Sequence, residues 1–338
     1  MTPIRTLAAA AAALTALALA LTGCSGQSGP EGVDSRATGA EAAEAAWPRT
    51  IEVPASGGGA ASTLTIGAEP QRIAALDYES AEVLAELGLA GRVVLIPEAV
   101  LSPALGGHIA ELGAVPATFP VASEVEAETV ISLEPDLVVM SARHGNEEPI
   151  AEVLQQAGIP ALQLPASWVS PAALDTNIGL IGQATGTEAA AAELVERIDS
   201  GLAAEAAEAP ADAGASPRVL VLTNQAGRPF VTAGDAYPIV LLELAGAQNV
   251  AAELGIDRTG PISAEQIVQA DPDGIVLIDM NGTGDRMFAE LLGSPAVAAL
   301  PAVAGDRMLR VEGRQVQALG LTATVDGLAA LTEWVGGL

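Results

Sequence analysis

The chain has 338 residues, of which 14 are basic and 42 acidic, and its net charge is −28 at pH 7. Because nucleic-acid phosphates are also negative, a chain this acidic does not bind nucleic acid through a general electrostatic field. The chain has a single cysteine, Cys24, so an internal disulfide cannot stabilise the fold. Charge and composition therefore exclude a nucleic-acid-binding protein and a disulfide-stabilised domain.

The first 24 residues follow the order of a secretory signal. One basic residue, Arg5, is followed by a long apolar run, small residues and Cys24. We predict a signal peptide over residues 1–23. The alternative, a retained transmembrane helix, needs about 20 apolar residues, and the run is short for that. Residues 24–46 are rich in Gly, Ser, Ala and acidic residues, which predicts a flexible tether.

The residues Leu21-Thr22-Gly23-Cys24 resemble the lipobox of bacterial lipoproteins. That resemblance implies cleavage just before Cys24 and a diacylglyceryl group on its thiol. Two acyl chains anchor a protein stably to a membrane. We therefore expect an extracytoplasmic protein that is lipid-anchored to the cell membrane through Cys24.

Short apolar runs alternate with helical patterns along the rest of the chain. Several runs are continuously apolar, as in strands covered on both faces, and the alternation favours an α/β fold with mostly parallel sheets. Helices are expected at residues 80–89 and 150–157. The predicted strands are residues 72–77, 93–96, 136–140, 161–164, 218–223, 274–279 and 308–311.

One segment of the chain occurs twice. Residues 127–139 (AETVISLEPDLVV) and 264–276 (AEQIVQADPDGIV) share Ala, Glu, Pro, Asp and the apolar positions. Each copy predicts a short helix, a Pro-Asp turn and a buried strand. Chance similarity is the alternative to two similar lobes.

A strongly helix-forming segment, residues 187–209, lies between the two halves, and residues 210–217 contain the prolines that end it. We predict a first lobe over residues 47–186, a linking helix over 187–209 and a second lobe over 210–338. A single stiff connector predicts limited hinge motion.

Motifs over residues 70–335 resemble the substrate-binding lipoproteins of ABC importers for iron complexes and cobalamin. The matching segments are residues 71–76 (QRIAAL), 82–88 (EVLAELG), 133–139 (LEPDLVV), 243–251 (ELAGAQNVA), 263–265 (SAE) with 272–273 (PD), and 300–303 (LPAV). The resemblance implies a class III periplasmic-binding-protein-like fold, with two Rossmann-like lobes joined by one long helix. It also implies a binding protein and not an enzyme, with an ABC permease and its ATPase subunit as partners. Members of this family expose one glutamate per lobe to permease arginines, and Glu82 and Glu243 stand at the matching places.

Ligands of open α/β sheets bind beyond the carboxyl ends of the strands. The scarce aromatic, histidine and arginine residues of this chain fall in the segments that follow the predicted strands, and Asn224 lies in one of them. The candidate ligand-binding residues are Tyr78, Arg143, His144, Trp168, Arg228, Tyr237, Arg286 and Arg314.

A phenolate or an imidazole can ligate haem iron, and arginine pairs with propionates or chelate oxygens. We therefore favour haem over a ferric siderophore, with His144 and Tyr237 as the iron ligands and Tyr78 as a substitute. Some haem-binding members of the family use a histidine of the first lobe with a tyrosine of the second. Each residue also has a simpler interpretation, as a solvated loop residue or a packed helix end. His108 is expected in a surface loop and Trp334 in the core.

Other ligand and function classes stay open. Cobalamin is an alternative ligand, because Trp168 could stack on it. Zinc- and manganese-binding relatives need three histidines, and this chain has two. No Gly-x-Ser-x-Gly elbow, P-loop or His-Glu-x-x-His motif points to an envelope-anchored enzyme, and an adhesion or scaffold protein is the third class. We expect a monomer with no intrinsic cofactor, and no metal except the iron of a bound haem.

Overall fold

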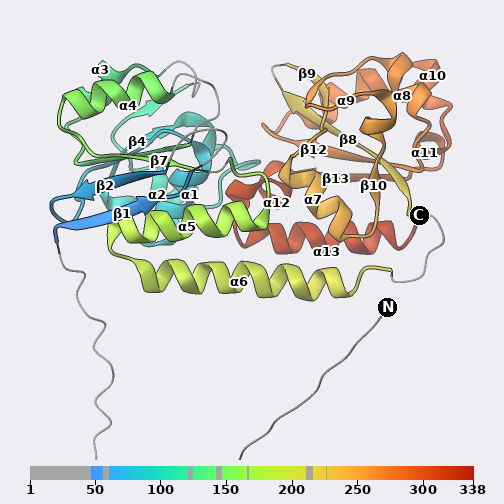
Figure 1. Cartoon of the computed structure of the whole chain (residues 1–338). Coiled ribbons are helices and arrows are strands. Elements are labelled where there is room, and N and C mark those ends of the chain that lie inside the picture. The colour runs from blue at the N-terminus through green and yellow to red at the C-terminus, as the bar shows by residue number, and fades with distance from the viewer. Residues whose placement is uncertain are drawn as a thin grey trace, which may run out of the picture. The chain divides into compact units, whose positions relative to one another are not determined.

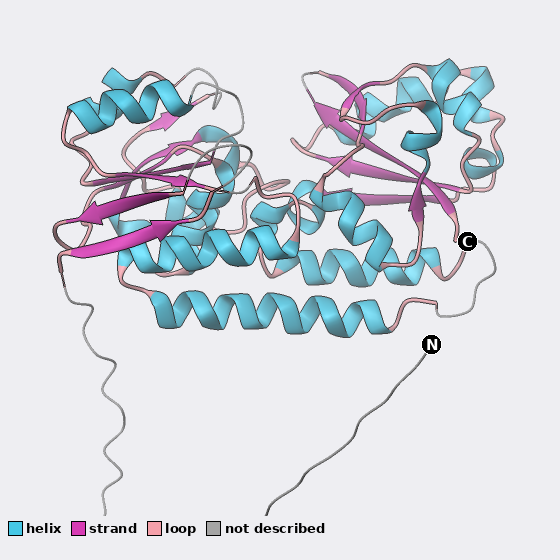
Figure 2. Cartoon of the chain, viewed as in Figure 1, coloured by secondary structure: helices cyan, strands magenta, loops and turns pink. Residues whose placement is uncertain are grey.

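The computed structural model describes residues 47–55, 61–120, 125–141, 147–165, 167–210, 216–225 and 227–338 (Figures 1 and 2). Residues Ala45–Leu338 form one compact unit that contains two main sheets. The predicted signal peptide, the tether, Cys24, Arg143 and His144 lie outside the described residues. No helix in the described ranges is long and apolar enough to cross a membrane.

The first main sheet has five parallel strands in the order β5-β4-β3-β6-β7. Strands β3, β4 and β6 are buried along their whole length, because helices cover both faces of the sheet. We call this sheet and its helices lobe one. Its strands are β3 (Ile73–Ala75), β4 (Val93–Pro97), β5 (Thr118–Phe119), β6 (Leu137–Ser141) and β7 (Ala161–Leu164). Its helices are α1 (Tyr78–Glu86), α2 (Ile109–Leu112), α3 (Ala127–Ser132), α4 (Glu147–Gln156) and α5 (Pro171–Thr185), with short 3₁₀ turns η1 (Ala90–Arg92) and η2 (Glu98–Leu101). An antiparallel hairpin of β1 (Arg49–Val53) and β2 (Ser62–Ile66) precedes them.

The second main sheet follows the order β11-β9-β8-β12-β13, with the short β10 also on β8. Strands β8, β10, β12 and β13 are parallel, whereas β9 pairs antiparallel with both of its neighbours, β8 and β11. We call this sheet and its helices lobe two. Its strands are β8 (Arg218–Gln225), β9 (Arg228–Val231), β10 (Gln248–Asn249), β11 (Gly260–Pro261), β12 (Gly274–Asp279) and β13 (Met308–Glu312). Its helices are α7 (Tyr237–Leu244), α8 (Ala264–Ala270), α9 (Gly284–Leu292), α10 (Pro295–Ala298), α11 (Pro301–Ala304), α12 (Gly313–Val316) and α13 (Ala323–Val335), with 3₁₀ turns η4 (Val250–Leu254) and η5 (Ala318–Gly320).

The predicted linking helix is confirmed as α6 (Glu188–Ala207), which packs on α5 of lobe one and on α13 of lobe two (Figure 1). Its buried residues recur at helical spacing on one side, at Ala191, Leu194, Ile198 and Leu202. Each main sheet is built wholly from residues on one side of α6 in the sequence.

Glycines bring these helices close together. A Cβ on Gly182 of α5 would lie 2.6 Å from the Cβ of Ala191, and one on Gly201 of α6 would lie 2.6 Å from Cγ2 of Val325. Separations this short are not tolerated between real side chains, so α6 approaches both lobes through glycine at the contact. The connection between the two lobes is therefore a layer of packed helices and not a single helix without neighbours.

The repeated segment builds the same structure in both lobes. Asp136 accepts a hydrogen bond from the amide of Arg72 at 2.9 Å, and Asp273 accepts one from the amide of Arg218 at 2.8 Å. The guanidinium of each arginine donates to carbonyls at the end of the repeated helix, α3 or α8. The residue before each Pro-Asp pair has a positive φ, 50° in one copy and 40° in the other. The repeat thus ties the first strand of each lobe to its Pro-Asp turn.

Candidate ligand-binding site

Loops at the carboxyl ends of strands from both sheets meet at one place. The amide of Arg314 donates to the carbonyl of Ala104, in the loop after β4, at 2.9 Å. A Cβ on Gly313 would lie 2.7 Å from Cδ2 of Leu105 and 2.9 Å from Sδ of Met280. Met280 follows β12, and Gly313 follows β13. This contact is therefore where carboxyl ends of parallel strands from the two main sheets come together, the position at which ligands of open α/β sheets bind.

A buried amide organises the edge of lobe two. Asn224, which is 1% exposed at the end of β8, donates to Asp279 at 2.7 Å and to Asn281 at 2.9 Å. Its carbonyl oxygen accepts from the amide of Met280 at 2.6 Å. Burial alone would raise the pKa of Asp279, but hydrogen bonds from Asn224 and from three backbone amides outweigh it, so its pKa is lowered. Asp279 is therefore a carboxylate that holds the loop after β12 in place.

A pocket of about 440 Å³ opens beside this loop, and we call it the β13 pocket. The Arg310 guanidinium and the Asp285 carboxylate form an ion pair of 3.0 Å within its lining. A positive charge, a negative charge and one buried aromatic ring are therefore present at the carboxyl ends of β12 and β13. The lining residues are Leu277, Asp279, Gly284, Asp285, Phe288, Arg310, Val311, Glu312 and Gln315.

Three of the predicted ligand-binding arginines lie at this edge of lobe two. Arg314 is the second residue of α12, and its Nε donates to Glu312 at 2.7 Å while its side chain stays 41% exposed. Arg228 opens β9 opposite the end of β8, is exposed, and stacks on Phe230 at 5.3 Å from the ring centroid. Arg286 is exposed on the first turn of α9. The edge therefore offers guanidinium groups to an anionic or oxygen-rich ligand.

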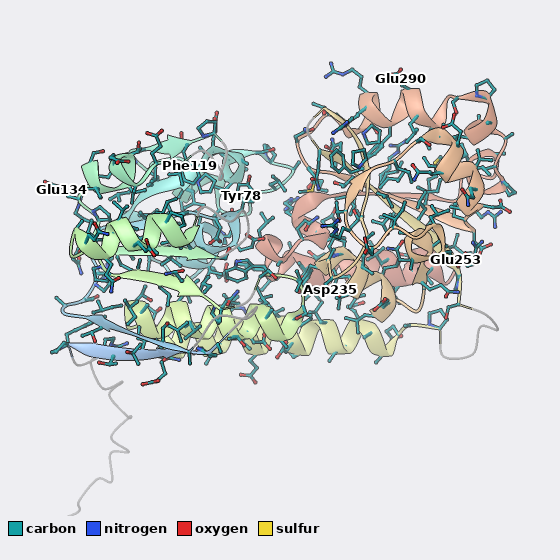
Figure 3. All side chains as sticks on the ribbon, turned by 45° about the horizontal axis from the view of Figure 1, so that its top comes forward. Tyr78, Phe119, Glu134, Asp235, Glu253 and Glu290 are labelled. Atoms are coloured by element: carbon teal, nitrogen blue, oxygen red, sulfur yellow. The ribbon has the colours of Figure 1, made fainter. Side chains whose placement is uncertain are left out.

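Tyr78 lies at the corresponding edge of lobe one. It is the first residue of α1, where Asp77 caps the helix by accepting from the amide of Ser80 at 2.8 Å. Tyr78 is half-buried and packs against the core (Figure 3). It follows β3 directly, as expected for a residue at a strand's carboxyl end.

Two predicted ligand residues are instead buried in the core. Tyr237 is 2% exposed, and its phenol lies near Asp175, Asp199 and Thr324 of the helix layer. Burial raises the pKa of Tyr237 to about 12, which disfavours a phenolate. Trp168 is 3% exposed and belongs to the same core cluster. The structure therefore places both rings in the core and not at an exposed strand end, where we expected them.

The predicted docking glutamates differ in exposure. Glu243 is exposed on α7, whereas the side chain of Glu82 is 1% exposed and its Oε2 lies 2.7 Å from Nδ1 of His108. A buried carboxylate with a local partner is not available to a permease arginine, so the expectation for Glu82 is wrong. His108 lies in a partly exposed loop, as expected, and its ring contacts Glu82. Trp334 is partly buried against the core, as expected.

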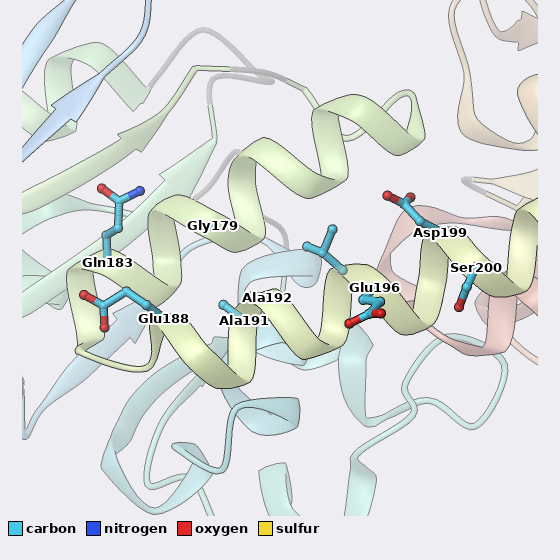
Figure 4. Close-up of a pocket in the computed structure, with 9 residues that line it drawn as sticks. Gly179, Gln183, Glu188, Ala191, Ala192, Glu196, Asp199 and Ser200 are labelled. Atoms are coloured by element: carbon cyan, nitrogen blue, oxygen red, sulfur yellow. The ribbon is translucent and has the colours of Figure 1, made fainter. Parts of the chain in front are cut away.

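A second pocket, of about 720 Å³, lies elsewhere, between α5 and α6 (Figure 4). Its lining residues are acidic, amide, hydroxyl or aliphatic, and they include Glu188, Glu196 and Asp199. The groove faces no strand end, so the topology of the fold gives it no role in ligand capture. Across the ranges that the structure covers, no group of three or more His, Cys, Asp and Glu side chains is placed to hold a metal ion.

Comparisons with known proteins agree with this architecture. The profile of the family described as periplasmic binding protein matches residues 73–312. A cobalamin-binding protein of Halobacterium salinarum is 28% identical over 217 residues, which are 64% of this chain. The match spans 56% of that relative, so this chain covers little more than half of its length.

Solved structures of haem-binding proteins share the fold. The periplasmic haem-binding protein RhuT from Roseiflexus sp. RS-1 is 24% identical with a TM-score of 0.67, covering 80% of this chain and 100% of that one. The haem-binding protein HmuT is 21% identical with a TM-score of 0.64, covering 87% and 91%. The periplasmic haem-binding protein HutB of Vibrio cholerae is 24% identical with a TM-score of 0.63, covering 78% and 98%. At these identities the likeness concerns the fold.

Proposed function

Because the chain belongs to the periplasmic binding protein family, we propose that it is the extracytoplasmic substrate-binding component of an ABC importer. The observation that carries this proposal is the meeting of strand-end loops from the two sheets at Ala104, Met280 and Arg314. A ligand next to that contact touches both lobes and stabilises one arrangement of them. A permease can then distinguish the loaded protein from the empty one.

We further propose a metal chelate as the ligand. Arg228, Arg286 and Arg314 supply positive charge at the lobe-two edge, in a chain whose net charge is −28. Haem or a ferric siderophore presents carboxylates or chelate oxygens that guanidinium groups pair with. Because Tyr237 is buried, we propose His144 and Tyr78 as the side chains that would ligate haem iron. Cobalamin is the second candidate, because the relative from Halobacterium salinarum carries that name.

A titration of the purified full-length protein with haemin, a ferric hydroxamate and cyanocobalamin tests the proposal. Absorbance and tryptophan fluorescence should show 1:1 saturation by one of the three. Arg228→Gln and Arg314→Gln should each weaken that binding by roughly tenfold, because a charge-assisted hydrogen bond contributes about 1.5–3 kcal/mol.

Arg258→Gln is the matched control, because Arg258 is a lobe-two arginine whose side chain is 92% exposed and whose only close carboxylate in the described chain is Asp257 at 3.9 Å. It should leave the affinity unchanged. Saturation by none of the three ligands would contradict the chelate proposal, as would equal affinities of all three arginine variants and the unmodified protein.

The internal repeat supplies a pair of candidate docking carboxylates in place of Glu82. Glu128 and Glu265 are the second residues of α3 and α8, the repeated helices, and both are exposed. Since the repeat builds equivalent structure in each lobe, the two carboxylates occupy equivalent positions. We propose that they, together with or instead of Glu243, pair with permease arginines.

Cells that take up the identified ligand provide the test of docking. The double variant Glu128→Gln, Glu265→Gln should lower uptake strongly while the purified protein keeps its ligand affinity. Glu290→Gln, at an exposed residue of α9, is the control. Full uptake by the double variant would move the docking role to Glu243 or to other residues.

Membrane attachment through Cys24 is the remaining part of the proposal. The protein made with its signal should partition into detergent on phase separation, and Cys24→Ser should move it to the aqueous phase. Partition of the Cys24→Ser variant into detergent would indicate a retained apolar helix in place of a lipid.

A further inference from the structure

Both ring nitrogens of His108 face carboxylate oxygens. Nδ1 lies 2.7 Å from Oε2 of Glu82, and Nε2 lies 2.9 Å from Oε2 of Glu86. A neutral imidazole has one N–H group, so its second nitrogen would direct a lone pair at an oxygen that can only accept. With both carboxyl groups ionised, the geometry is satisfied only by an imidazolium, which donates to both glutamates.

The surrounding charges favour the same state. The side chain of Glu82 is 1% exposed, and those of Glu86 and His108 are 22% and 23% exposed. From α6, Arg197 donates to the other oxygen of Glu86 at 2.6 Å. Two carboxylates are thus balanced by two cations, and loss of the His108 proton would leave Glu82 as a buried carboxylate without a counter-ion.

The hydrogen bond that His108 donates to Glu82 is the largest influence on the histidine and raises its pKa. Burial acts in the opposite direction, and the charges of Glu82 and Glu86 raise the pKa further. These two residues of α1 are the charged groups that face the ring, and Arg197 of α6 reaches it through Glu86.

This cluster holds a loop through which lobe one touches lobe two. Glu82 Oε2 also accepts from the amide of Gly107 at 3.2 Å. Three residues earlier, the carbonyl of Ala104 accepts from the amide of Arg314 of α12. A Cβ on Gly106 would lie 1.8 Å from the carbonyl oxygen of Val100, so this loop is tightly turned. Because the loop is tightly turned, a movement of Gly107 also moves Ala104.

The rest of α1 strengthens the connection. α1 packs on η5 of lobe two as well as on its own sheet. The glutamates that hold His108 are therefore part of a helix that contacts both lobes.

We propose that Glu82, His108, Glu86 and Arg197 form a proton-dependent latch on the contact between the two lobes. While His108 carries its second proton, it and Glu82 hold the loop of residues 104–107 against α12. When the proton is lost, the Glu82 carboxylate draws in water, the loop loosens and the Ala104–Arg314 hydrogen bond weakens. The latch makes the lobe contact, and through it ligand retention, sensitive to pH.

The direction of the pH dependence follows from the raised pKa of His108. A group whose pKa is higher in the folded state stabilises that state fully below its unfolded value, about 6.5 for histidine. The stabilisation is lost as the pH rises through the folded value. The latch is thus closed below about pH 6.5 and opens as the pH rises through the folded pKa of His108.

Nitrogen NMR of the ¹⁵N-histidine-labelled full chain tests the charge state directly, because the chain has two histidines and His144→Gln identifies the signals of His108. Both His108 nitrogens should carry protons at about pH 6, and the titration midpoint should lie above 6.5. A neutral tautomer at pH 6, or a midpoint at or below 6.5, would overturn the proposal.

Hydrogen exchange of the Arg314 amide tests the coupling to the lobe contact. Its protection factor should fall by roughly tenfold between the closed and the open latch, while that of Leu277 in β12 stays constant. Glu82→Gln should produce the same loss at about pH 6, where the latch of the unmodified protein is closed. The control Glu253→Gln removes the exposed ion pair with Arg218 and should not affect Arg314.

If Glu82→Gln does not fold, Glu86→Gln and the pH series of the unmodified protein still decide the question. Protection of Arg314 that does not change while His108 titrates would show that the cluster does not control the lobe contact.

Discussion

Substitution of Tyr237 separates core packing from ligation. The ring is 2% exposed at the start of α7. Burial raises its pKa to about 12, two units above that of a free tyrosine. At about 1.4 kcal/mol per unit, forming the phenolate costs about 3 kcal/mol more than for a free tyrosine. We therefore expect Tyr237 to contribute to stability and not to iron binding.

The expected magnitudes follow from burial. Tyr237→Ala leaves a cavity and should lower the free energy of unfolding by about 3–5 kcal/mol. Tyr237→Phe keeps the ring and should change it by no more than about 1 kcal/mol. Urea denaturation gives both values, and ligand titration of Tyr237→Phe should give the affinity of the unmodified protein. A Phe variant of full stability that binds the ligand tenfold more weakly would show that the phenol is a ligand after all.

Two further substitutions test the helix layer and the tight loop. Burial and the charge of Asp199 raise the pKa of Asp175 to about 6, so stability should fall as the pH rises from about 4 to 6. Asp175→Asn should raise the free energy of unfolding by about 1 kcal/mol at pH 7.5 and leave it unchanged at pH 4. This gain is well below the free energy that corresponds to the full pKa shift, because the carboxylate is partly exposed. Equal gains at both pH values in urea denaturation would exclude a charge effect. Gly106→Ala should lower the free energy of unfolding by about 3 kcal/mol or more, because its Cβ would overlap the carbonyl of Val100. The control Gly91→Ala has open space around its Cβ and should change that free energy by no more than about 0.5 kcal/mol in thermal unfolding. Equal losses in the two variants would contradict the close approach at Gly106.

The fold follows from the sequence wherever strands are long and apolar. All seven predicted strands are confirmed, because fully buried parallel strands such as β4 and β12 are continuous apolar runs. Strands β5, β10 and β11 are missed because each has two residues, too few for a pattern. The β1–β2 hairpin is missed although β1 alternates between buried and exposed residues, a signal that strand periodicity offers.

The sequence predicts where the residues of the candidate site lie along the strands, but it does not predict which of them are buried. Strand ends locate Tyr78, Arg228 and Arg314 at sheet edges, because ligand loops follow parallel strands. Whether Tyr237 faces solvent depends on how α5, α6 and α13 pack around it, which no local pattern reveals. Glu82 occupies a buried position that an ion pair with His108 makes possible, and these residues lie 26 positions apart in the sequence. The organising role of Asn224 is likewise visible only once Asp279 and Asn281 are in place.

Ligand-dependent hydrogen exchange of the full-length protein tests the central claim most directly. Once titration has identified the chelate, its addition should slow exchange in the loop after β4 and in residues 279–286 and 312–316, where strand ends of the two sheets meet. Slower exchange confined to the groove between α5 and α6 would contradict capture at the strand ends.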